Sequence, residues 1–331
     1  MRTERDPLIT GLGEGQRRTI QALRSQGRFF WLDLLVDGEQ LEEAQAREQL
    51  TAALGVPEHA LRVLFDFESG TPLLRKYHAD GEHVVFAFHS ITHPNAPFDA
   101  GARAIRAVEV HVLVHGDYLL TVHEKPAQLQ PPPEESPPAE RGEKYLVFFA
   151  LFEMTITLFE ALNHLSEGLQ ELESGSRNPA TELKTIRRLR ARLTEVRRIA
   201  GRQTVLFSHV AEEIERVRGL GGTESSQYFA RIESQLARLV SGIDATGQAL
   251  AALVDQGMNT IMFRLTVVAT IFLPLTVITG FFGMNFDWLL KNIGGKSDFL
   301  VYGVGSLALA IMIALIVMRR EVPVLVRGDE G

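Results

Sequence analysis

Cysteine is absent from this sequence of 331 residues. Disulfide bonds, thiolate metal sites and cysteine nucleophiles are therefore excluded. A surplus of basic residues is also missing, because 34 Lys and Arg residues stand against 41 Asp and Glu residues and give a net charge of −7. Nucleic-acid binding requires a basic surface, so we expect no nucleic-acid partner.

The signatures of common enzymes are missing as well. Neither Gly-x-Ser-x-Gly nor the phosphate-binding Gly-x-x-x-x-Gly-Lys occurs, so we do not expect an enzyme. The N-terminus carries Arg2, Glu4 and Asp6 without a following apolar run, which is not the pattern of a cleavable signal peptide. The long N-terminal part is therefore expected in the cytoplasm.

Two long apolar runs are present near the C-terminus. Leu265 to Gly283 contains no charged side chain, and as a helix it is about 28 Å long, close to a bilayer core of about 30 Å. Arg264 precedes this run, and Arg319 and Arg320 follow the second. The positive-inside rule then places both termini in the cytoplasm. We expect a first span over 265–285, an external loop over 286–298, a second span over 299–318 and a cytoplasmic tail over 319–331.

Short-range patterns divide the remaining chain. Asp80-Gly81 and Gly116-Asp117 each separate two strand-like runs, which is typical of β-hairpins. Helical spacing of apolar residues follows Glu39 and continues in several long stretches after the prolines near residue 130. These patterns predict a polar tail over 1–27, an α+β or α/β domain over 28–126, a Pro-rich linker over 127–142, a helical bundle over 143–222 and a stalk helix over 223–264.

The run from Tyr145 to Phe159 is apolar enough to suggest a third span. Glu153 lies within it and Glu160 directly follows it. A carboxylate at mid-bilayer is costly. We therefore favour a buried helix of the bundle over a membrane span.

The first span is unusual for a simple lipid anchor. It carries Pro274 at mid-span, Gly280, and four threonines, which are Thr266, Thr270, Thr276 and Thr279. Polar groups at membrane depth usually face protein or water. One face of this helix is therefore expected to meet something other than lipid.

This segment resembles the CorA family of divalent-cation channels. The resemblance rests on the stretch from Thr270 to Thr276, on Gly280, and on Gly283-Met284-Asn285 at the outer end of the first of two C-terminal spans. In domain order it extends over nearly the whole chain. It implies a funnel-shaped homopentamer in the cell membrane that admits hydrated Mg²⁺, with Co²⁺ or Ni²⁺ as further cargo, and that needs no cofactor. Pro274 and Gly280 then mark the kink of the pore helix, and Met284 belongs to the signature.

Steps of three and four residues place a stripe along one side of this helix. The stripe contains Asp255, Asn259, Met262, Leu265, Ala269, Leu273, Thr276 and Gly280, and it leads to Asn285. Two spans per chain cannot enclose water, so a pore requires a symmetric oligomer with the stripe on its axis. Ordinary helix packing is the alternative that periodicity leaves open.

The resemblance implies a role for each part of the stripe. Met262, Leu265 and Leu273 form hydrophobic gates. Asp255 and Asn259 line the inner mouth, and Thr276 forms a polar ring in the pore. Magnesium loses its water reluctantly, so the Asn285 amides and Gly283 carbonyls are expected to hold the hydrated ion. A simple helix cap is the alternative role for Asn285.

Two other functions remain open. The external loop departs from the acidic pattern of many family members, because Lys291 and Lys296 offset Asp287 and Asp298. A transporter of Zn²⁺ or another transition metal, with the same architecture and with or without proton coupling, is therefore one alternative. A membrane-anchored sensor or scaffold without conduction is the other, and the threonines and proline of the first span argue against it.

Cytoplasmic metal sites have weaker signals. The resemblance also implies a regulatory site, at which cytoplasmic Mg²⁺ holds the channel shut. Family members often carry Asp after an aromatic pair at the start of the stalk helix, but here Tyr228-Phe229 is followed by Arg231 and Ser234. Loose candidates for such a site are Asp66, Glu68, Glu224 and Asp244. A second hypothesis, a Zn²⁺ or Ni²⁺ site, joins His111 and His115 on one strand face with His123 and His89 on neighbouring strands. Packed histidines are the favoured interpretation.

Overall fold

The structure is a computed structural model. It describes residues 8–36, 42–67, 76–96, 106–127, 129–133, 142–174, 179–284, 295, 297, 299–313 and 316. The chain divides into two compact units, Met1–Leu250 and Ala251–Gly331. Each unit is described by itself.

A six-stranded mixed sheet organises the first unit. Its strands are β1 (Leu8–Thr10), β2 (Phe30–Leu35), β3 (Tyr77–Ala79), β4 (His83–Thr92), β5 (Arg106–His115) and β6 (Tyr118–His123), in the spatial order β1-β2-β6-β5-β4-β3. β2 pairs in parallel with β1 and β6, and the other pairs are antiparallel. Both predicted hairpins, β3–β4 and β5–β6, are confirmed. Gly81 has a φ of 91°, which the first turn requires.

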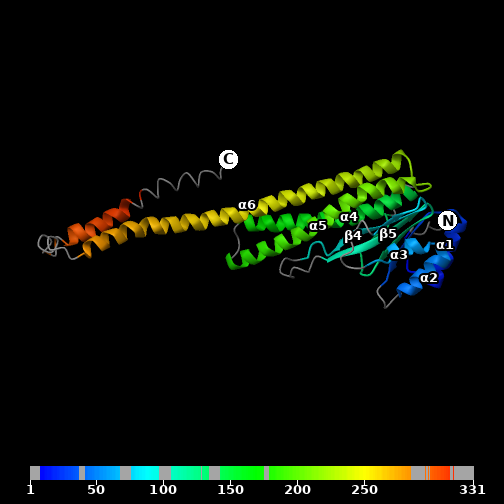
Figure 1. The fold of residues 1–331 in the computed structure, drawn as a ribbon, viewed down its shortest axis with the longest axis horizontal. Coiled ribbons are helices and arrows are strands. Elements are labelled where there is room, and N and C mark those ends of the chain that lie inside the picture. The colour runs from blue at the N-terminus through cyan, green and yellow to red at the C-terminus, as the bar shows by residue number, and fades with distance from the viewer. Residues whose placement is uncertain are drawn as a thin grey trace. The chain divides into compact units, whose positions relative to one another are not determined.

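Helices cover both faces of this sheet (Figure 1). They are α1 (Glu14–Ser25), α2 (Glu43–Leu54), α3 (Glu58–Leu64), α4 (Glu143–Glu173), α5 (Pro179–Arg216) and α6 (Thr223–Phe282). α2 ends at Gly55, which adopts the left-handed conformation with a φ of 75°. The segment after Leu61 is helical to Leu64.

Alternation along the strands builds two cores. Trp31, Phe86 and Val112 face the long helices and pack in one cluster with side chains of α4, α5 and α6. Leu32 and Leu113 face the opposite way and pack with α1, α2 and α3. β4 and β5 are thus buried on both faces over most of their length, which explains the apolar runs Val84–Phe88 and Val112–Val114.

The described part of the predicted polar tail over 1–27 carries a strand and a helix of the sheet domain. β1 extends the sheet beside β2, and the Ile20 side chain of α1 is completely buried. Backbone pairing and the buried side chains of Ile9, Leu12 and Ile20 hold this segment, and so few apolar residues leave no strong hydrophobic pattern in a polar sequence.

The predicted division between a sheet domain over 28–126 and a bundle over 143–222 is also corrected. α4, α5 and the first part of α6 complete the core on one face of the sheet, so the two predicted domains form one unit. Of the predicted linker, Ala127 and Leu129 pack against this core, and residues 134–141 lie outside the described residues. The predicted stalk over 223–264 crosses the boundary between the two units at Leu250.

α4 is a core helix, as the carboxylates near its apolar run predict. Leu151, Met154 and Leu158 are fully buried. Of its most apolar stretch, 61% is buried within the protein. The interpretation as a buried helix is therefore confirmed.

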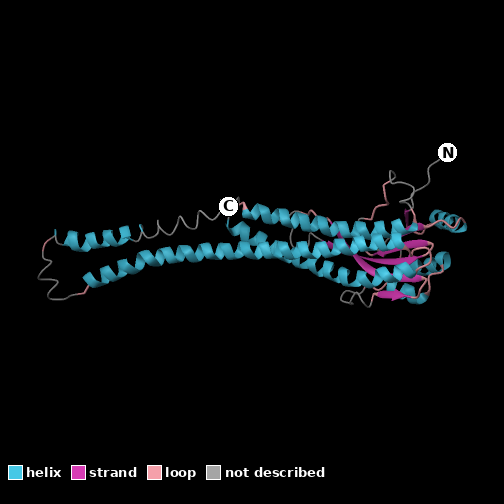
Figure 2. Ribbon diagram, turned by 90° about the horizontal axis from the view of Figure 1, so that it is seen from above, coloured by secondary structure: helices cyan, strands magenta, loops and turns pink. Residues whose placement is uncertain are grey.

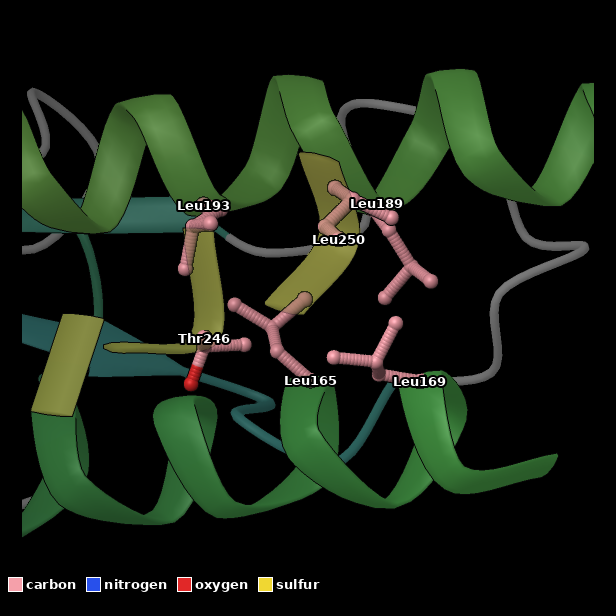
Figure 3. A pocket seen from close by; sticks show the side chains of 6 residues that line it. All are labelled: Leu165, Leu169, Leu189, Leu193, Thr246 and Leu250. Carbon is pink, nitrogen blue, oxygen red and sulfur yellow. The ribbon is translucent and has the colours of Figure 1, made fainter. Parts of the chain in front are cut away.

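α4, α5 and α6 approach one another closely where their side chains are small. A Cβ on Gly242 of α6 would lie 2.9 Å from Leu162 Cδ2 of α4. Further along, a small apolar gap separates the three helices (Figure 3). Its lining residues are Leu165, Leu169, Leu189, Leu193, Thr246 and Leu250.

Among its described residues, the second unit contains the C-terminal part of α6 and one further helix. This helix begins with the π-helical turn η4 (Phe299–Val304) and continues to Ile313 within the described residues. Figures 1 and 2 both show it beside the end of α6. The apolar stretch of α6 has none of its residues buried by the chain itself.

Candidate functional site

The stripe predicted on the first span lies on a single uninterrupted helix, α6, up to Phe282. At about 100° per residue, the positions from Asp255 to Gly280 fall within an arc of about 120°. Met262, Leu265 and Leu273 are 65%, 64% and 70% exposed. Asp255, Asn259 and Thr276 are exposed too. The described part of the chain therefore leaves the whole stripe open to other molecules.

The opposite side of α6 is partly covered. Half-buried residues recur there in helical steps, and they are Val267, Ile271, Leu275 and Ile278. The neighbouring helix, which lies alongside in both views (Figures 1 and 2), has a half-buried row of its own. That row contains Gly303, Ser306, Leu307 and Ala310. Three of these four residues, all except Leu307, are small and allow close approach of membrane helices, so the second span is expected to pack behind the stripe.

The threonine hydroxyls of the first span are satisfied within the helix. Thr266 donates to the Met262 carbonyl at 2.9 Å, and Thr276 donates to the Phe272 carbonyl at 2.7 Å. Thr270 and Thr279 make the same bond to the carbonyl four residues earlier. Each hydroxyl oxygen keeps lone pairs that can accept a bond from water. Threonine is therefore tolerated at membrane depth and still offers a polar surface.

Pro274 lies inside α6 and has no N–H group. The Thr270 carbonyl thus loses its regular backbone donor. A carbonyl freed in this way is costly in lipid and needs protein or water nearby. Pro274 is consistent with a helix that borders water at this depth.

Charge along the second unit's part of α6 is sparse and asymmetric. Between Ala251 and Met284 the charged residues are Asp255 and Arg264. Asp255 lies on the stripe, whereas Arg264 lies about 180° from it around the helix. The stripe therefore carries negative charge alone at its N-terminal end, which attracts cations.

The C-terminal end of the stripe is described in part. α6 ends in a turn at Gly283, whose N–H donates to the Thr279 carbonyl at 2.9 Å. Met284 is 44% exposed. Asn285 and residues 286–294 lie outside the described residues, so the predicted filter and most of the external loop stay predictions.

The loose acidic candidates for a regulatory site are not brought together. Asp244 pairs with Arg197 of α5 at 2.9 Å. Glu224 accepts a hydrogen bond from the Tyr228 hydroxyl at 3.3 Å and lies 3.9 Å from Lys144 Nζ. Asp66 follows α3 in the sheet domain, and Glu68 lies outside the described residues.

Of the four histidines of the metal hypothesis, His111 and His89 both lie next to Glu109, whereas His115 and His123 have other partners. His111 presents one ring nitrogen to the Leu64 carbonyl and the other to Glu109, both at 2.7 Å, which leaves neither for a metal. His123 lies on the other face of the sheet, next to Asp33 at 3.2 Å. His115 stacks on Tyr118. The favoured interpretation as packed histidines fits these contacts.

Lys76, His89 and His111 surround the Glu109 carboxylate of β5. Lys76 Nζ donates to Glu109 Oε1 at 2.6 Å, and His89 Nε2 lies 3.9 Å from Oε2. Burial raises the pKa of Glu109, but hydrogen bonds from His111 and Lys76 lower it more, so that it lies at about 2. The carboxylate is therefore ionised at neutral pH and balances the cations around it.

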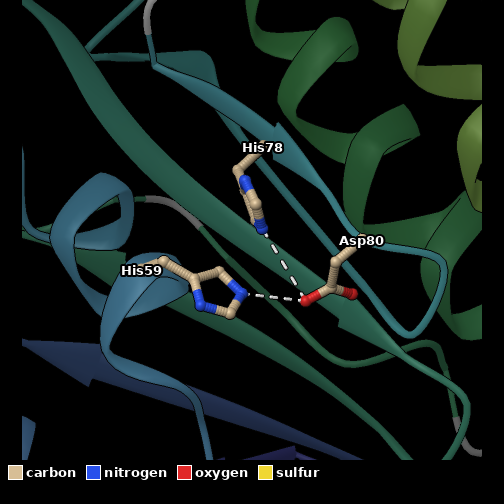
Figure 4. Close-up of side chains that lie close together, drawn as sticks. All are labelled: His59, His78 and Asp80. Atoms are coloured by element: carbon tan, nitrogen blue, oxygen red, sulfur yellow. Dashed lines mark hydrogen bonds and ion pairs between the residues drawn. The ribbon is translucent and has the colours of Figure 1, made fainter.

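A different histidine group was missed by sequence reasoning. His59, His78 and Asp80 point their ligand atoms at one another (Figure 4). A local signal was present, since His78-x-Asp80-x-x-His83 spans the first hairpin. His59 is distant in sequence and is brought there by α3.

Known proteins with similar sequence and fold support these observations. Residues 26–320 match the family described as CorA-like Mg²⁺ transporter protein. A Bacillus subtilis protein named putative metal ion transporter YfjQ is 27% identical over 165 residues, which cover 45% of this chain and 49% of that relative. The chain thus matches about half the length of this curated relative.

Solved structures agree in fold. The complete CorA magnesium transporter of Methanocaldococcus jannaschii is 19% identical, with a TM-score of 0.55 over 88% of this chain and 90% of that one. The ZntB cytoplasmic domain of Vibrio parahaemolyticus is 13% identical, with a TM-score of 0.50 over 70% of this chain and 86% of that one. At these identities the likeness concerns the fold alone. The family match extends over most of the sequence, and this chain therefore belongs to the CorA-like Mg²⁺ transporter family.

Proposed function

We propose that this protein is a divalent-cation channel of the cell membrane that admits Mg²⁺ as a homopentamer, with both termini in the cytoplasm. The observation that carries the proposal is the open stripe of α6, which faces away from the half-buried side of the same helix. Family membership supports the same function.

The stripe requires several copies of the chain. One helix cannot surround water, and the second span is expected behind the stripe rather than across from it. Copies related by a rotation axis place identical residues in rings. Asp255 then forms an acidic ring at the inner mouth, where it concentrates cations.

Met262, Leu265 and Leu273 form the closed gate in this arrangement. Rings of apolar side chains exclude water from a narrow pore, and the channel is closed when they are dry. The Thr276 ring and the lone pairs of the other threonines give the outer half a wettable wall. Asn285 and the Gly283 carbonyl accept hydrogen bonds from the water shell of the ion, so Mg²⁺ passes without full dehydration.

Ion uptake into proteoliposomes tests conduction. We expect Mg²⁺ uptake driven by concentration and membrane potential. A protein that acts as a scaffold or sensor would pass no ion in this assay, and that result would refute the channel. Competition among Mg²⁺, Co²⁺, Ni²⁺ and Zn²⁺, with and without a pH gradient, tests the cargo. Preferred Zn²⁺ uptake that depends on the gradient would replace Mg²⁺ transport by proton-coupled zinc transport.

Gate variants test the stripe itself. Leu265→Asn and Met262→Ser are expected to leak under conditions in which the wild type is closed, because a polar ring stabilises water. Val268→Asn is the matched control, since Val268 is 51% exposed but lies outside the arc of the stripe. Equal closed-state currents in Leu265→Asn and Val268→Asn would remove the stripe from the gate.

The filter and the oligomer have separate tests. Asn285→Ala is expected to change the rate and the ion selectivity, and unchanged values would leave Asn285 as a helix cap. Native mass spectrometry of the detergent-solubilised protein is expected to give five copies. A monomer or dimer would contradict a pore on a shared axis.

A further inference from the structure

A cluster of metal-ligating side chains lies at the edge of the sheet, where α3 packs against the β3–β4 hairpin. It contains His59 of α3, His78 of β3 and Asp80 of the hairpin turn (Figure 4). Their ligand atoms all lie within 4.8 Å of one another. His59 Nε2 is 3.0 Å and His78 Nε2 is 3.7 Å from the same oxygen, Asp80 Oδ2.

The hairpin turn fixes the carboxylate in place. Asp80 Oδ1 accepts the backbone N–H groups of Glu82 at 2.9 Å and His83 at 2.7 Å. This bonding occupies one carboxylate oxygen and directs Oδ2 toward the two imidazoles. His83 Nδ1 lies 3.3 Å from Oδ2 and further fixes its position. A ligand oriented by such partners binds metal more tightly than a mobile one.

The ring nitrogen of His78 points into the cluster and makes no hydrogen bond. Its Nε2 atom is buried from solvent and has no hydrogen-bond partner. A buried polar atom without a partner is costly. A bound cation at this point would satisfy it.

The spacing suits a small metal ion. Ligand atoms that bind zinc tetrahedrally at about 2.0–2.1 Å lie about 3.3 Å apart. The two measured separations from Oδ2, 3.0 and 3.7 Å, lie on either side of that value. His59 has 53% of its side chain exposed, which gives an ion access from solvent.

We propose that His59, His78 and Asp80 bind a divalent transition-metal ion of the Zn²⁺, Co²⁺ and Ni²⁺ group, with a water molecule in the fourth position. Two imidazoles and one carboxylate favour these ions, whereas Mg²⁺ prefers oxygen ligands alone. The site belongs to the sheet domain and holds its ion, so it goes beyond the passage of cations along α6. It is independent of whether the channel conducts.

Metal titration of the full-length protein in detergent tests the proposal. Co²⁺ serves as the spectroscopic probe, because tetrahedral Co²⁺ absorbs visible light far more strongly, and at longer wavelength, than octahedral hydrated Co²⁺ in a pore. Zn²⁺ is expected to displace this signal, and a large excess of Mg²⁺ is expected to leave it unchanged. The fluorescence of Trp31, which is fully buried in the sheet core, reports the rise in unfolding temperature that Zn²⁺ produces.

Three variants address the ligands. Asp80→Asn keeps an oxygen for the two backbone N–H groups and removes the charge, and His59→Gln and His78→Gln remove one imidazole each. Each is expected to lower the affinity for Co²⁺ by about tenfold or more. His209→Gln is the control, because His209 is an exposed histidine on α5 outside the cluster.

Two outcomes would overturn the proposal. One is a wild-type protein with no tetrahedral Co²⁺ signal and no thermal shift with Zn²⁺. The other is a signal that His59→Gln and His78→Gln retain at the wild-type affinity. Ion flux is not measured in this titration, so its failure would leave the channel proposal standing, and a failure of conduction would leave the metal site standing.

Discussion

His89 makes the stability of the sheet domain depend on pH. The side chain is 8% exposed, on β4 next to Glu109. Burial lowers the pKa of His89 to about 4 from an ordinary value of 6.5; the Glu109 carboxylate opposes this effect, and nearby positive charges such as Arg198 add to it. Between these values the unfolded chain binds a proton at this position and the folded chain does not. The free energy of unfolding therefore falls as the pH falls below 6.5.

The size of the effect follows from the two pKa values. Proton linkage at this single site predicts a loss of about 2 kcal/mol at pH 5 and about 3 kcal/mol at pH 4, relative to pH 7. Glu109 acts at lower pH, because its pKa of about 2 lies below the ordinary value of 4.5. Its contribution is lost as the pH falls from about 4.5 toward 2. The window between pH 6.5 and 5 is thus suited to measuring His89.

Urea unfolding in detergent at pH 7, 6 and 5, followed by Trp31 fluorescence, measures this loss. His89→Gln removes the titrating group and is expected to lose about 2 kcal/mol less than the wild type between pH 7 and pH 5. His209→Gln, which replaces an exposed histidine on α5, is expected to follow the wild type. Parallel pH profiles for His89→Gln and the wild type would refute the assignment of the loss to this buried imidazole.

Three further predictions concern packing and charge. Gly116→Ala places a Cβ 2.6 Å from the Arg218 carbonyl oxygen, and it is expected to lower the free energy of unfolding in urea by about 1–3 kcal/mol. Gly201→Ala is the control, because its Cβ meets open space in α5, and it is expected to raise that free energy by up to about 1 kcal/mol. Equal effects of the two variants would contradict the close approach at Gly116. Leu165→Ala enlarges the gap between α4, α5 and α6 and is expected to lower the free energy of unfolding by about 2–5 kcal/mol. A loss smaller than that caused by truncating an exposed leucine to alanine would show that the helices move together and close the gap. Asp255→Asn is expected to slow cation uptake most at low ionic strength, and a slowing independent of salt would argue against an electrostatic role.

Local chemistry made the hairpins and the long helices predictable. Asp80-Gly81 and Gly116-Asp117 specify their turns within a few residues, and the strands on either side follow. β1 was missed because a three-residue strand paired with β2 across the intervening α1 has no local signature. The union of sheet and bundle was missed for a related reason. Periodicity identifies the apolar side of α4, but it does not say whether another helix or a sheet covers that side.

Each candidate site was also predictable from the sequence only in part. Helical period alone placed Asp255, Met262 and Thr276 on one side of α6. It could not predict that the opposite side is the half-buried one, because that depends on a helix from another part of the chain. The ligand cluster was half visible, since His78 and Asp80 are neighbours in sequence. His59 reaches Asp80 through the packing of α3 on the sheet, a contact 21 residues apart in the chain.

Pro274 gives the last part of α6 a mechanical property that the rest of the helix lacks. One backbone bond of the helix is already missing at this turn, so bending here disrupts fewer interactions than bending at Met262 or Leu265. Thr276 and Gly280 lie beyond the weak turn. In the proposed pore, this weak turn would let the part of each helix beyond Pro274 swing outward and widen that end of the pore, while the Met262 and Leu265 rings kept their diameter.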